Sequence, residues 1–377
     1  MTITIQELLK TTVDREASDL HITTNIPPQI RVHGFLVSLD SAPLTPTESK
    51  TLIYSLLTDK QKKLFEDKLE LDFSFGIQDI GRFRANVFMQ KGAVAAAIRR
   101  FMPSMWSFEQ LGLPRRLAKL CQLPRGLVLV TGPTGSGKST TLACMIDSVN
   151  INRAVHIVTI EDPIEYFFTP KKSVINQREL HVDTHSFPNA LRAVLREDPD
   201  VVLVGEMRDM ETVEATLRVA ETGHLTFSTL HTNSAAETIS RIVDIFPADY
   251  QSQVRIMLSM CLQGVITQAL LPRADGRGRV LALEILILNP AIRNLIRENK
   301  IHQIYAAMQM GQEKFGMQTF NQSLAELYLK KLITLETARD ASSKPEELTD
   351  IIQRKDHQQA ASQDSSAAQV GKSVRSQ

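Results

Sequence analysis

The chain has 377 residues, of which 43% are hydrophobic, and its 43 Lys and Arg nearly balance its 42 Asp and Glu. This length predicts two domains, or at most three, and is ample for at least one large core. The formal net charge of +1 argues against a general nucleic-acid-binding protein, which would carry a strong basic excess.

The cysteines and the apolar segments restrict the compartment. Cys121, Cys144 and Cys261 are too widely spaced for a CxxC zinc motif or a disulfide framework. No apolar run approaches the roughly 18 residues of a membrane span, and the N-terminus lacks the basic and apolar segments of a signal peptide. We therefore expect a soluble protein of the reducing cytosol.

Residues 1–101 are predicted to form a small mixed α+β domain. Apolar residues at helical spacing predict a first helix over 5–13. The sequence TPTE at 45–48 combines an N-cap, a proline at the first helical position and a capping-box acid, which predicts a second helix through about residue 58. Extended segments, the last three in an antiparallel sheet, are predicted at 19–23, 29–37, 71–75, 82–88 and 93–98.

Residues 102–114, with two prolines and a glycine, are predicted to link this domain to a second one at 115–345. There, apolar runs of strand length alternate with helical stretches, which predicts an α/β fold with a parallel sheet covered on both faces. Residues 346–377 are predicted to be a polar, disordered tail. The predicted strands are 127–131, 155–160, 201–204 and 225–230, and the predicted helices are 138–149, 187–196, 210–221 and 235–246, with a mainly helical end over 292–338.

The segment GPTGSGKS at 132–139 fits the phosphate-loop pattern G-x-x-x-x-G-K-[ST] between a predicted strand and a predicted helix. Glycines let the loop wrap its N–H groups round phosphate oxygens, and the helix N-terminus adds positive potential. Lys138 would reach the β- and γ-phosphates of ATP, and the Ser139 hydroxyl would bind Mg²⁺. The expected nucleotide-binding residues are Gly132, Pro133, Thr134, Gly135, Ser136, Gly137, Lys138, Ser139 and Thr140.

Acidic residues end two of the predicted core strands. Glu206 is expected to polarise the attacking water, because Gly205 stands where a metal-binding Asp is usual. Carboxylates in IEDPIE at 160–165 are expected to balance the charge of Mg²⁺, which prefers hard oxygen ligands. Ordinary strand-end or solvated acids are the alternative. The expected metal ligands are Ser139, Glu161, Glu165 and Glu206, and Glu161 is also expected to act in catalysis.

Histidines flank the predicted strand 225–230. His224 and His231 are seven residues apart, so they would face opposite sides of a strand and are not expected to share a metal. We expect this polar strand end to sense the γ-phosphate, although a structural histidine is the alternative. His181 and His185 have a metal-like spacing, but they lack the intervening Glu and lie in a predicted loop, so we predict no zinc site there.

Arginines gather on the two strands that end the first domain. Alternation places Arg82 and Arg84 on one face, whereas Arg99 and Arg100 face opposite ways. Arginine is the planar, permanently charged donor that can complete a phosphate site in trans. Taken alone, the pattern favours the alternative of a solvated basic sheet face.

Together these segments resemble the secretion-ATPase superfamily, whose Walker A, Asp box, Walker B and His box they match. Within it, the chain resembles the type IV pilus retraction ATPases (PilT family), over nearly all residues except the tail. The matching segments are GPTGSGKS (132–139), IEDPIE (160–165), REDPDVVLVGEMRD (196–209), the His box (223–235), AIRNLIRE (291–298) and GMQTFNQS (316–323).

The resemblance implies a PAS-like N-terminal domain joined to a RecA-like ATPase core, with six copies forming a ring and nucleotide between the domains. It implies that Glu206 is the catalytic glutamate and His231 the His-box histidine. Arg84 and Arg99 match family arginines that approach the phosphates, with Arg82 nearby, so the resemblance reverses the preference for a solvated face.

The function implied is a homohexameric, Mg²⁺-dependent ATPase that drives pilus retraction and twitching motility. Its implied partners are an inner-membrane pilus platform protein and a second retraction ATPase, so it would lie peripherally at the cytoplasmic face of the inner membrane. Pilus-extension motors carry a four-cysteine zinc motif that three scattered cysteines cannot supply. An extension or type II secretion motor, and a weakly hydrolysing accessory ring subunit, remain alternatives.

The segment AIRNLIRE at 291–298 lies outside the nucleotide motifs. We predict that it supports retraction more than hydrolysis, so that changing Leu295 or Ile296 spares ATPase activity more than twitching motility. The alternative is a plain amphipathic helix, since Ile292, Leu295 and Ile296 have the spacing of an inward-facing stripe.

Overall fold

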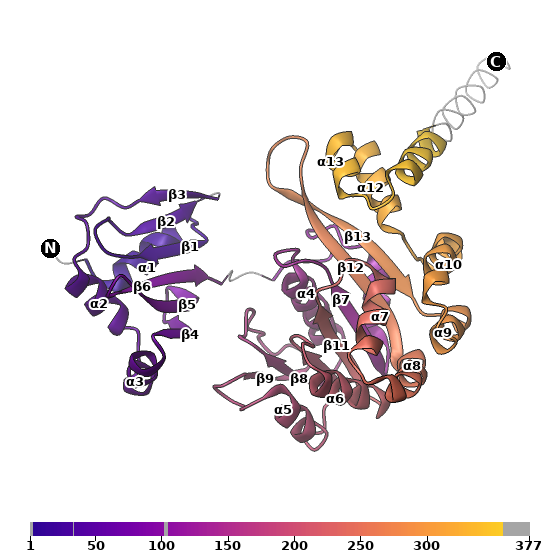
Figure 1. Ribbon diagram of the computed structural model, residues 1–377, viewed down its shortest axis with the longest axis horizontal. Helices are drawn as coiled ribbons and strands as arrows, with labels where there is room; N and C mark the ends of the chain where they lie inside the picture. Colours follow the sequence, from indigo (N-terminus) through magenta and orange to yellow (C-terminus); the bar gives the residue numbers. More distant parts are fainter. Residues whose placement is uncertain (1–2, 33, 102–104, 357–377) are drawn as a thin grey trace, which may run out of the picture. The chain divides into compact units, whose positions relative to one another are not determined.

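The computed structural model describes residues 3–32, 34–101 and 105–356. The chain divides into two compact units, Met1–Ser104 with Pro163–Phe167, and Met105–Asp162 with Phe168–Gln377 (Figure 1). Within the described ranges, no helix combines the length and the apolar character that crossing a bilayer requires.

The first unit is an antiparallel sheet with helices packed on it. Residues such as Leu8, Leu9 and Ile53 on the helices and Phe83 and Ile98 on the strands share one buried core. The strands, in spatial order, are β3 (Phe35–Ser38), β2 (Gln29–Val32), β1 (Asp19–Ile22), β6 (Ala93–Arg100), β5 (Gly81–Gln90) and β4 (Glu70–Ile77), and the helices are α1 (Ile5–Asp14), α2 (Pro46–Tyr54) and α3 (Asp59–Lys68).

Two predictions for this unit need correction. The extended segment 29–37 is two paired strands, β2 and β3, with Gly34 between them at a φ of +91°. The helix predicted through residue 58 ends at Tyr54, because Thr58 starts a new helix. The Thr58 hydroxyl accepts the Gln61 N–H, and the Gln61 side chain accepts the Thr58 N–H, so a second capping box begins α3.

The second unit is built on a mainly parallel sheet of seven strands. All four predicted strands are present, and their carboxyl ends lie along one edge, where α/β sheets place ligands. The strands, in spatial order, are β13 (Arg279–Ile287), β12 (Leu262–Pro272), β7 (Gly126–Thr131), β11 (Leu225–Leu230), β10 (Val201–Val204), β8 (His156–Glu161) and β9 (Val174–Glu179); only the edge strand β13 is antiparallel to its neighbour.

Helices cover both faces of this sheet, as the continuous apolar strands predicted. Leu127 and Leu129 of β7 pack in one core with α6, α7 and α8, whereas Val128 and Val130 pack in another with η1 and α4. The covering helices are η1 (Arg115–Gln122), α4 (Lys138–Asn152), α5 (Phe187–Val194), α6 (Met210–Glu221), α7 (Ala235–Asp244) and α8 (Ala248–Cys261).

The C-terminal part of this unit is mainly helical, as predicted. The prediction of a disordered tail from residue 346 is wrong over 346–356. A helix covers 345–356 and packs Leu348 and Ile352 into a core with α12. The rest of the predicted tail, 357–377, and part of the predicted linker, 102–104, lie outside the described residues. The elements are α9 (Pro290–Arg297), η2 (Ile301–Gln303), α10 (Ile304–Met310), α11 (Gln312–Phe315), α12 (Phe320–Leu329) and α13 (Leu335–Ala341).

Candidate ATPase site

The predicted phosphate loop joins β7 to α4. Gly132, Gly135 and Gly137 have φ values of +138°, +78° and +87°, which residues with a side chain rarely adopt. A Cβ on Gly132 would lie 2.2 Å from the carbonyl oxygen of Gln268, so only glycine fits. The Ser136 hydroxyl is buried and has no hydrogen-bond partner among the described residues. A phosphate oxygen would supply that missing acceptor.

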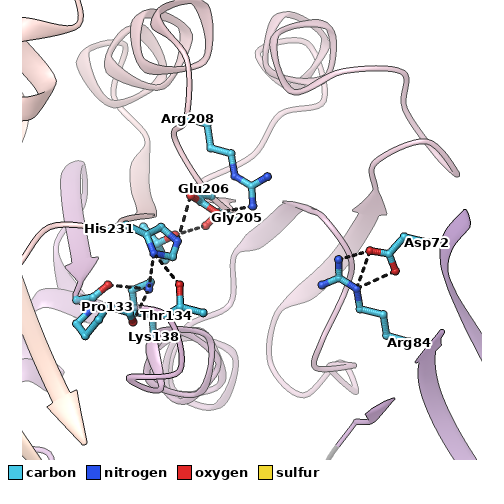
Figure 2. A network of polar contacts seen from close by, with 11 residues as sticks. Asp72, Arg84, Pro133, Thr134, Lys138, Gly205, Glu206, Arg208 and His231 are labelled. Atoms are coloured by element: carbon cyan, nitrogen blue, oxygen red, sulfur yellow. Dashed lines mark hydrogen bonds and ion pairs between the residues drawn. The ribbon is translucent and has the colours of Figure 1, made fainter. Parts of the chain in front are cut away.

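Lys138 is buried at the end of this loop, and Ser139 and Thr140 follow it in the first turn of α4. The Lys138 Nζ donates to the carbonyl oxygens of Gly132 and Pro133 at 2.8 and 3.1 Å. These bonds hold the ammonium over the start of the loop (Figure 2). An ammonium has three donors, so phosphate oxygens can compete for them without moving the charge away.

Glu206 lies just beyond β10 and is held from two sides. Its Oε2 is 2.8 Å from Arg208 Nη2, and its Oε1 is 3.1 Å from His231 Nε2 (Figure 2). Partial burial raises the pKa of Glu206, but the Arg208 and His231 interactions outweigh it and leave the pKa below its usual range. The carboxylate is therefore ionised at neutral pH and can accept a hydrogen bond from water.

His231 connects Glu206 to the phosphate loop. Its Nε2 faces Glu206, while its Nδ1 lies 3.4 Å from Thr134 Oγ1 and 3.5 Å from Lys138 Nζ. The structure thus brings the Walker A, Walker B and His-box residues into one network. His224, at the other end of β11, instead lies 3.0 Å from the Val219 carbonyl oxygen.

The two predicted Asp-box carboxylates are placed differently. Glu161 ends β8, where its Oε1 accepts from the Thr159 hydroxyl at 2.6 Å. A Cβ on Gly205 would lie 3.3 Å from the Glu161 Cα, so the ends of β8 and β10 touch beside Glu206. Glu165 belongs to Pro163–Phe167, which clusters with the first unit.

No group of three or more His, Cys, Asp or Glu is placed to hold a metal within the part of the chain that the structure describes. Mg²⁺ typically keeps several waters and binds one or two carboxylates together with substrate phosphates. The Ser139 hydroxyl and the carboxylates of Glu161 and Glu206 are donors of the hard oxygen type that it prefers.

The predicted arginines lie in the first unit. Arg84 of β5 and Arg99 of β6 are directly opposite each other in the strand register, so they share a sheet face. An acid accompanies each: Arg84 Nε donates to Asp72 Oδ1 at 3.0 Å, and Arg99 Nε donates to Asp19 Oδ1 at 3.0 Å (Figure 2 for the first pair). Arg82 Nη2 lies 3.4 Å from the Ser74 hydroxyl.

Three residues that position the site were not predicted. Arg208 lies in the segment that matches the Walker B motif, but no function was predicted for it. The Thr229 hydroxyl donates to the Gly205 carbonyl oxygen at 2.7 Å, which ties β11 to the turn before Glu206. Gln268 contacts the phosphate loop from β12, a strand that the sequence reading missed.

Glu284 of β13 also had no predicted role. Its Oε1 accepts the Ala235 N–H at 2.7 Å and so fixes the start of α7, four residues after His231. Burial raises the pKa of Glu284, and the bonds from the Ala235 and Phe320 N–H groups only partly oppose that rise.

Comparison with known proteins supports the motif resemblance. The profile of the type II/IV secretion system protein family matches residues 1–339. The type IV pilus retraction ATPase PilT of Pseudomonas aeruginosa is 51% identical over 342 residues, covering 91% of this chain and 99% of its own. The twitching motility protein of Neisseria gonorrhoeae is 50% identical over 345 residues, covering 92% of each chain.

A solved structure agrees in fold. The crystal structure of the pilus retraction motor PilT with bound ADP superposes with a TM-score of 0.86 at 56% identity, covering 92% of this chain and 98% of that one. The predicted P-loop α/β fold and the predicted resemblance to pilus retraction ATPases are confirmed. The chain belongs to the type II/IV secretion system protein family.

Proposed function

We infer that the chain is an ATPase that powers type IV pilus retraction, and we propose that it works as a Mg²⁺-dependent homohexameric motor. One observation carries the chemistry: Lys138, His231 and Glu206 form a continuous polar network at the carboxyl edge of the sheet. Similarity over nearly the full length of retraction ATPases supports the biological role.

Hydrolysis of ATP needs positioning and charge neutralisation more than covalent chemistry by the protein. The loop N–H groups and Lys138 neutralise the phosphates, and Ser139 and Glu161 are suited to hold Mg²⁺. Mg²⁺ held there would supply positive charge to balance the negative charge that develops on the phosphates. Glu206, ionised and fixed by Arg208 and His231, accepts a hydrogen bond from water and orients it for attack.

Arginines of a neighbouring subunit would complete the site. Arg84 and Arg99 are adjacent on one sheet face, and their side chains are 42% and 71% exposed, so a ligand can reach them. Arginine suits phosphate oxygens because its planar fork donates two parallel hydrogen bonds. Loss of the γ-phosphate would loosen this contact, and the resulting domain movement would drive the motor.

The proposed partners are those of a retraction motor. The ring would dock on a pilus platform protein in the inner membrane, from its cytoplasmic face, and would work beside a second retraction ATPase. The absence of a cysteine cluster supports retraction over extension: the three cysteines are free and buried, and burial raises the pKa of each to about 12.

A deletion strain tests the direction of the motor. If the chain drives retraction, deletion leaves cells that carry excess pili but do not twitch, because assembly continues without disassembly. Bald cells would instead support an extension motor, and failure of protein secretion would support a type II secretion motor. A chain with Glu206→Gln should reproduce the deletion; full complementation by that variant would support an accessory, weakly hydrolysing subunit.

A further inference from the structure

Gln268 contacts the phosphate loop from a different strand. β12 runs parallel to β7, with Thr267 opposite Thr131, so Gln268 lies beside Gly132, where the loop begins. The Gln268 side chain is only 1% exposed. Gln268, which follows Ser136 in the sequence by 132 positions, therefore forms part of the wall of the loop.

Gln268 touches both ends of the loop. Its backbone carbonyl oxygen occupies the space that a Cβ of Gly132 would need. Its side-chain Nε2 donates to the Ser136 carbonyl oxygen at 2.7 Å and would lie 3.4 Å from a Cβ of Gly137. One residue thus fixes the start of the loop through its backbone and the end of the loop through its amide.

The hydrogen bond to Ser136 sets the direction of a phosphate-binding donor. In a planar trans peptide the C=O and the N–H point in opposite directions. Because Gln268 holds the Ser136 carbonyl oxygen toward β12, the N–H of Gly137 points away from β12. The N–H groups of such a loop bind phosphate only when they point into its hollow, and Gly137 is the residue that begins α4.

Packing alone does not account for a glutamine here. Ile266, two residues before Gln268 on the same face of β12, is apolar and fully buried. The Gln268 Oε1 is buried too, and it has no hydrogen-bond partner within the described ranges. Such an unpaired acceptor costs free energy that an apolar side chain of the same length would avoid. The bond from Nε2 is the feature that an apolar residue could not reproduce.

We propose that Gln268 is a positioning residue of the ATPase site, which orients the Ser136–Gly137 peptide for binding the phosphates of ATP and ADP. The proposal rests on the nucleotide site described above. It gives the strand pair β12–β13, which joins the core to the C-terminal helices, a direct part in nucleotide affinity.

The test replaces Gln268 by Met, which keeps the length of the side chain and removes the donor. The purified full chain is titrated with ADP, and its Tm is measured with and without ADP. We expect the Kd for ADP and the KM for ATP to rise about tenfold, the size expected for losing one positioning hydrogen bond. We expect kcat to change less than about threefold and the rise of Tm with ADP to shrink.

A matched control is Thr216→Val on α6, which also removes one buried side-chain donor to a backbone carbonyl. It should lower the Tm without nucleotide but leave the Kd for ADP unchanged. Gln268→Glu, which keeps the shape and places a carboxylate against the Ser136 carbonyl, is the second variant if Gln268→Met does not fold.

The outcomes separate this proposal from the function itself. If the unaltered chain binds no ADP, the nucleotide site is wrong. If the unaltered chain binds ADP and a folded Gln268 variant binds it equally well, only the role of Gln268 is refuted. Equal loss of affinity in the Gln268 and Thr216 variants would also refute it, because the effect would then be one of general stability.

Discussion

At the scale of single residues, Arg208 controls the charge of the proposed catalytic carboxylate. Its guanidinium is 2.8 Å from Glu206 and contributes the largest of the effects that lower the pKa of Glu206. The role proposed for Glu206 requires the ionised carboxylate, so we expect activity to fall on the acid side as this carboxylate gains a proton. Arg208 therefore extends the active range toward lower pH.

We predict that Arg208→Met moves the acid limb of the pH–activity profile to higher pH. Without the positive charge, burial raises the pKa of Glu206 with less opposition, so protonation begins nearer neutrality. The measurement is kcat/KM for ATP between about pH 5 and pH 8, with Arg208→Lys as the control that keeps the charge. An acid limb at the same pH in the Met and Lys variants would contradict the prediction.

The sequence predicts the contacts of residues that belong to motifs, but not the contacts of residues that belong to none. Lys138 and Glu206 belong to local patterns, so their placement near each other follows from strands that end at one edge. Gln268 belongs to no pattern, and its contact with Ser136 depends on the register between β12 and β7. That register is a property of the folded sheet.

At the scale of elements, continuous apolar runs flanked by helices were sufficient to predict β7, β8, β10 and β11. The pair β12–β13 was missed, since the stretch Leu262–Pro272 mixes apolar residues with two glutamines and directly follows a helix. The capping box at Thr58 is visible in the sequence, but the start of α3 was not predicted from it. The helix at 345–356 was not predicted because few apolar residues, Leu348, Ile351 and Ile352, mark its buried side.

The apolar side of the helix α9 is buried in the structure. The predicted amphipathic character is confirmed, as Ile292 and Ile296 are fully buried in the main core and Leu295 packs against it. Truncating such an isoleucine to alanine costs about 2–5 kcal/mol. Ile296 variants are therefore a poor test of the predicted role in retraction, because they would destabilise the ATPase unit as a whole.

Exposed residues of α9 provide the better test of its role in retraction. Arg297 is exposed, and its Nη2 donates to Asn294 Oδ1 of the same helix at 3.1 Å. We predict that Arg297→Ala leaves the ATPase rate within about twofold, as surface changes seldom alter stability, and reduces twitching motility. ATPase assays and twitching-zone diameters measure the two effects, and an equal loss of both would assign the helix a structural role only.

At the scale of the whole molecule, neighbouring subunits of the proposed ring would share each site. Arg84 and Arg99 lie in the first unit, and the phosphate loop lies in the second. Each arginine is accompanied by an acid, Asp72 or Asp19, which limits the repulsion between two like charges on adjacent strands. A phosphate that reached this pair would have to compete with the two acids for the arginine donors.

Mixing two inactive variants tests whether these arginines act in trans. An Arg84→Ala/Arg99→Ala chain keeps its loop, and a Lys138→Ala chain keeps its arginines. We predict that each alone is inactive and that an equal mixture, assembled together, recovers activity. Random mixing gives about a quarter of sites an intact loop beside an intact neighbour's arginines. A mixture as inactive as its components would contradict action in trans.

Glu206, held by Arg208 and His231 beside the phosphate loop, is the residue that we propose orients the water that attacks ATP. The most direct measurement is steady-state ATP hydrolysis by the purified full chain and by its Glu206→Gln variant, with Mg²⁺ present. We expect Mg²⁺-dependent turnover by the unaltered chain and a loss of at least about a hundredfold in the variant, with ADP binding retained. A near-normal rate in the Glu206→Gln variant would contradict it.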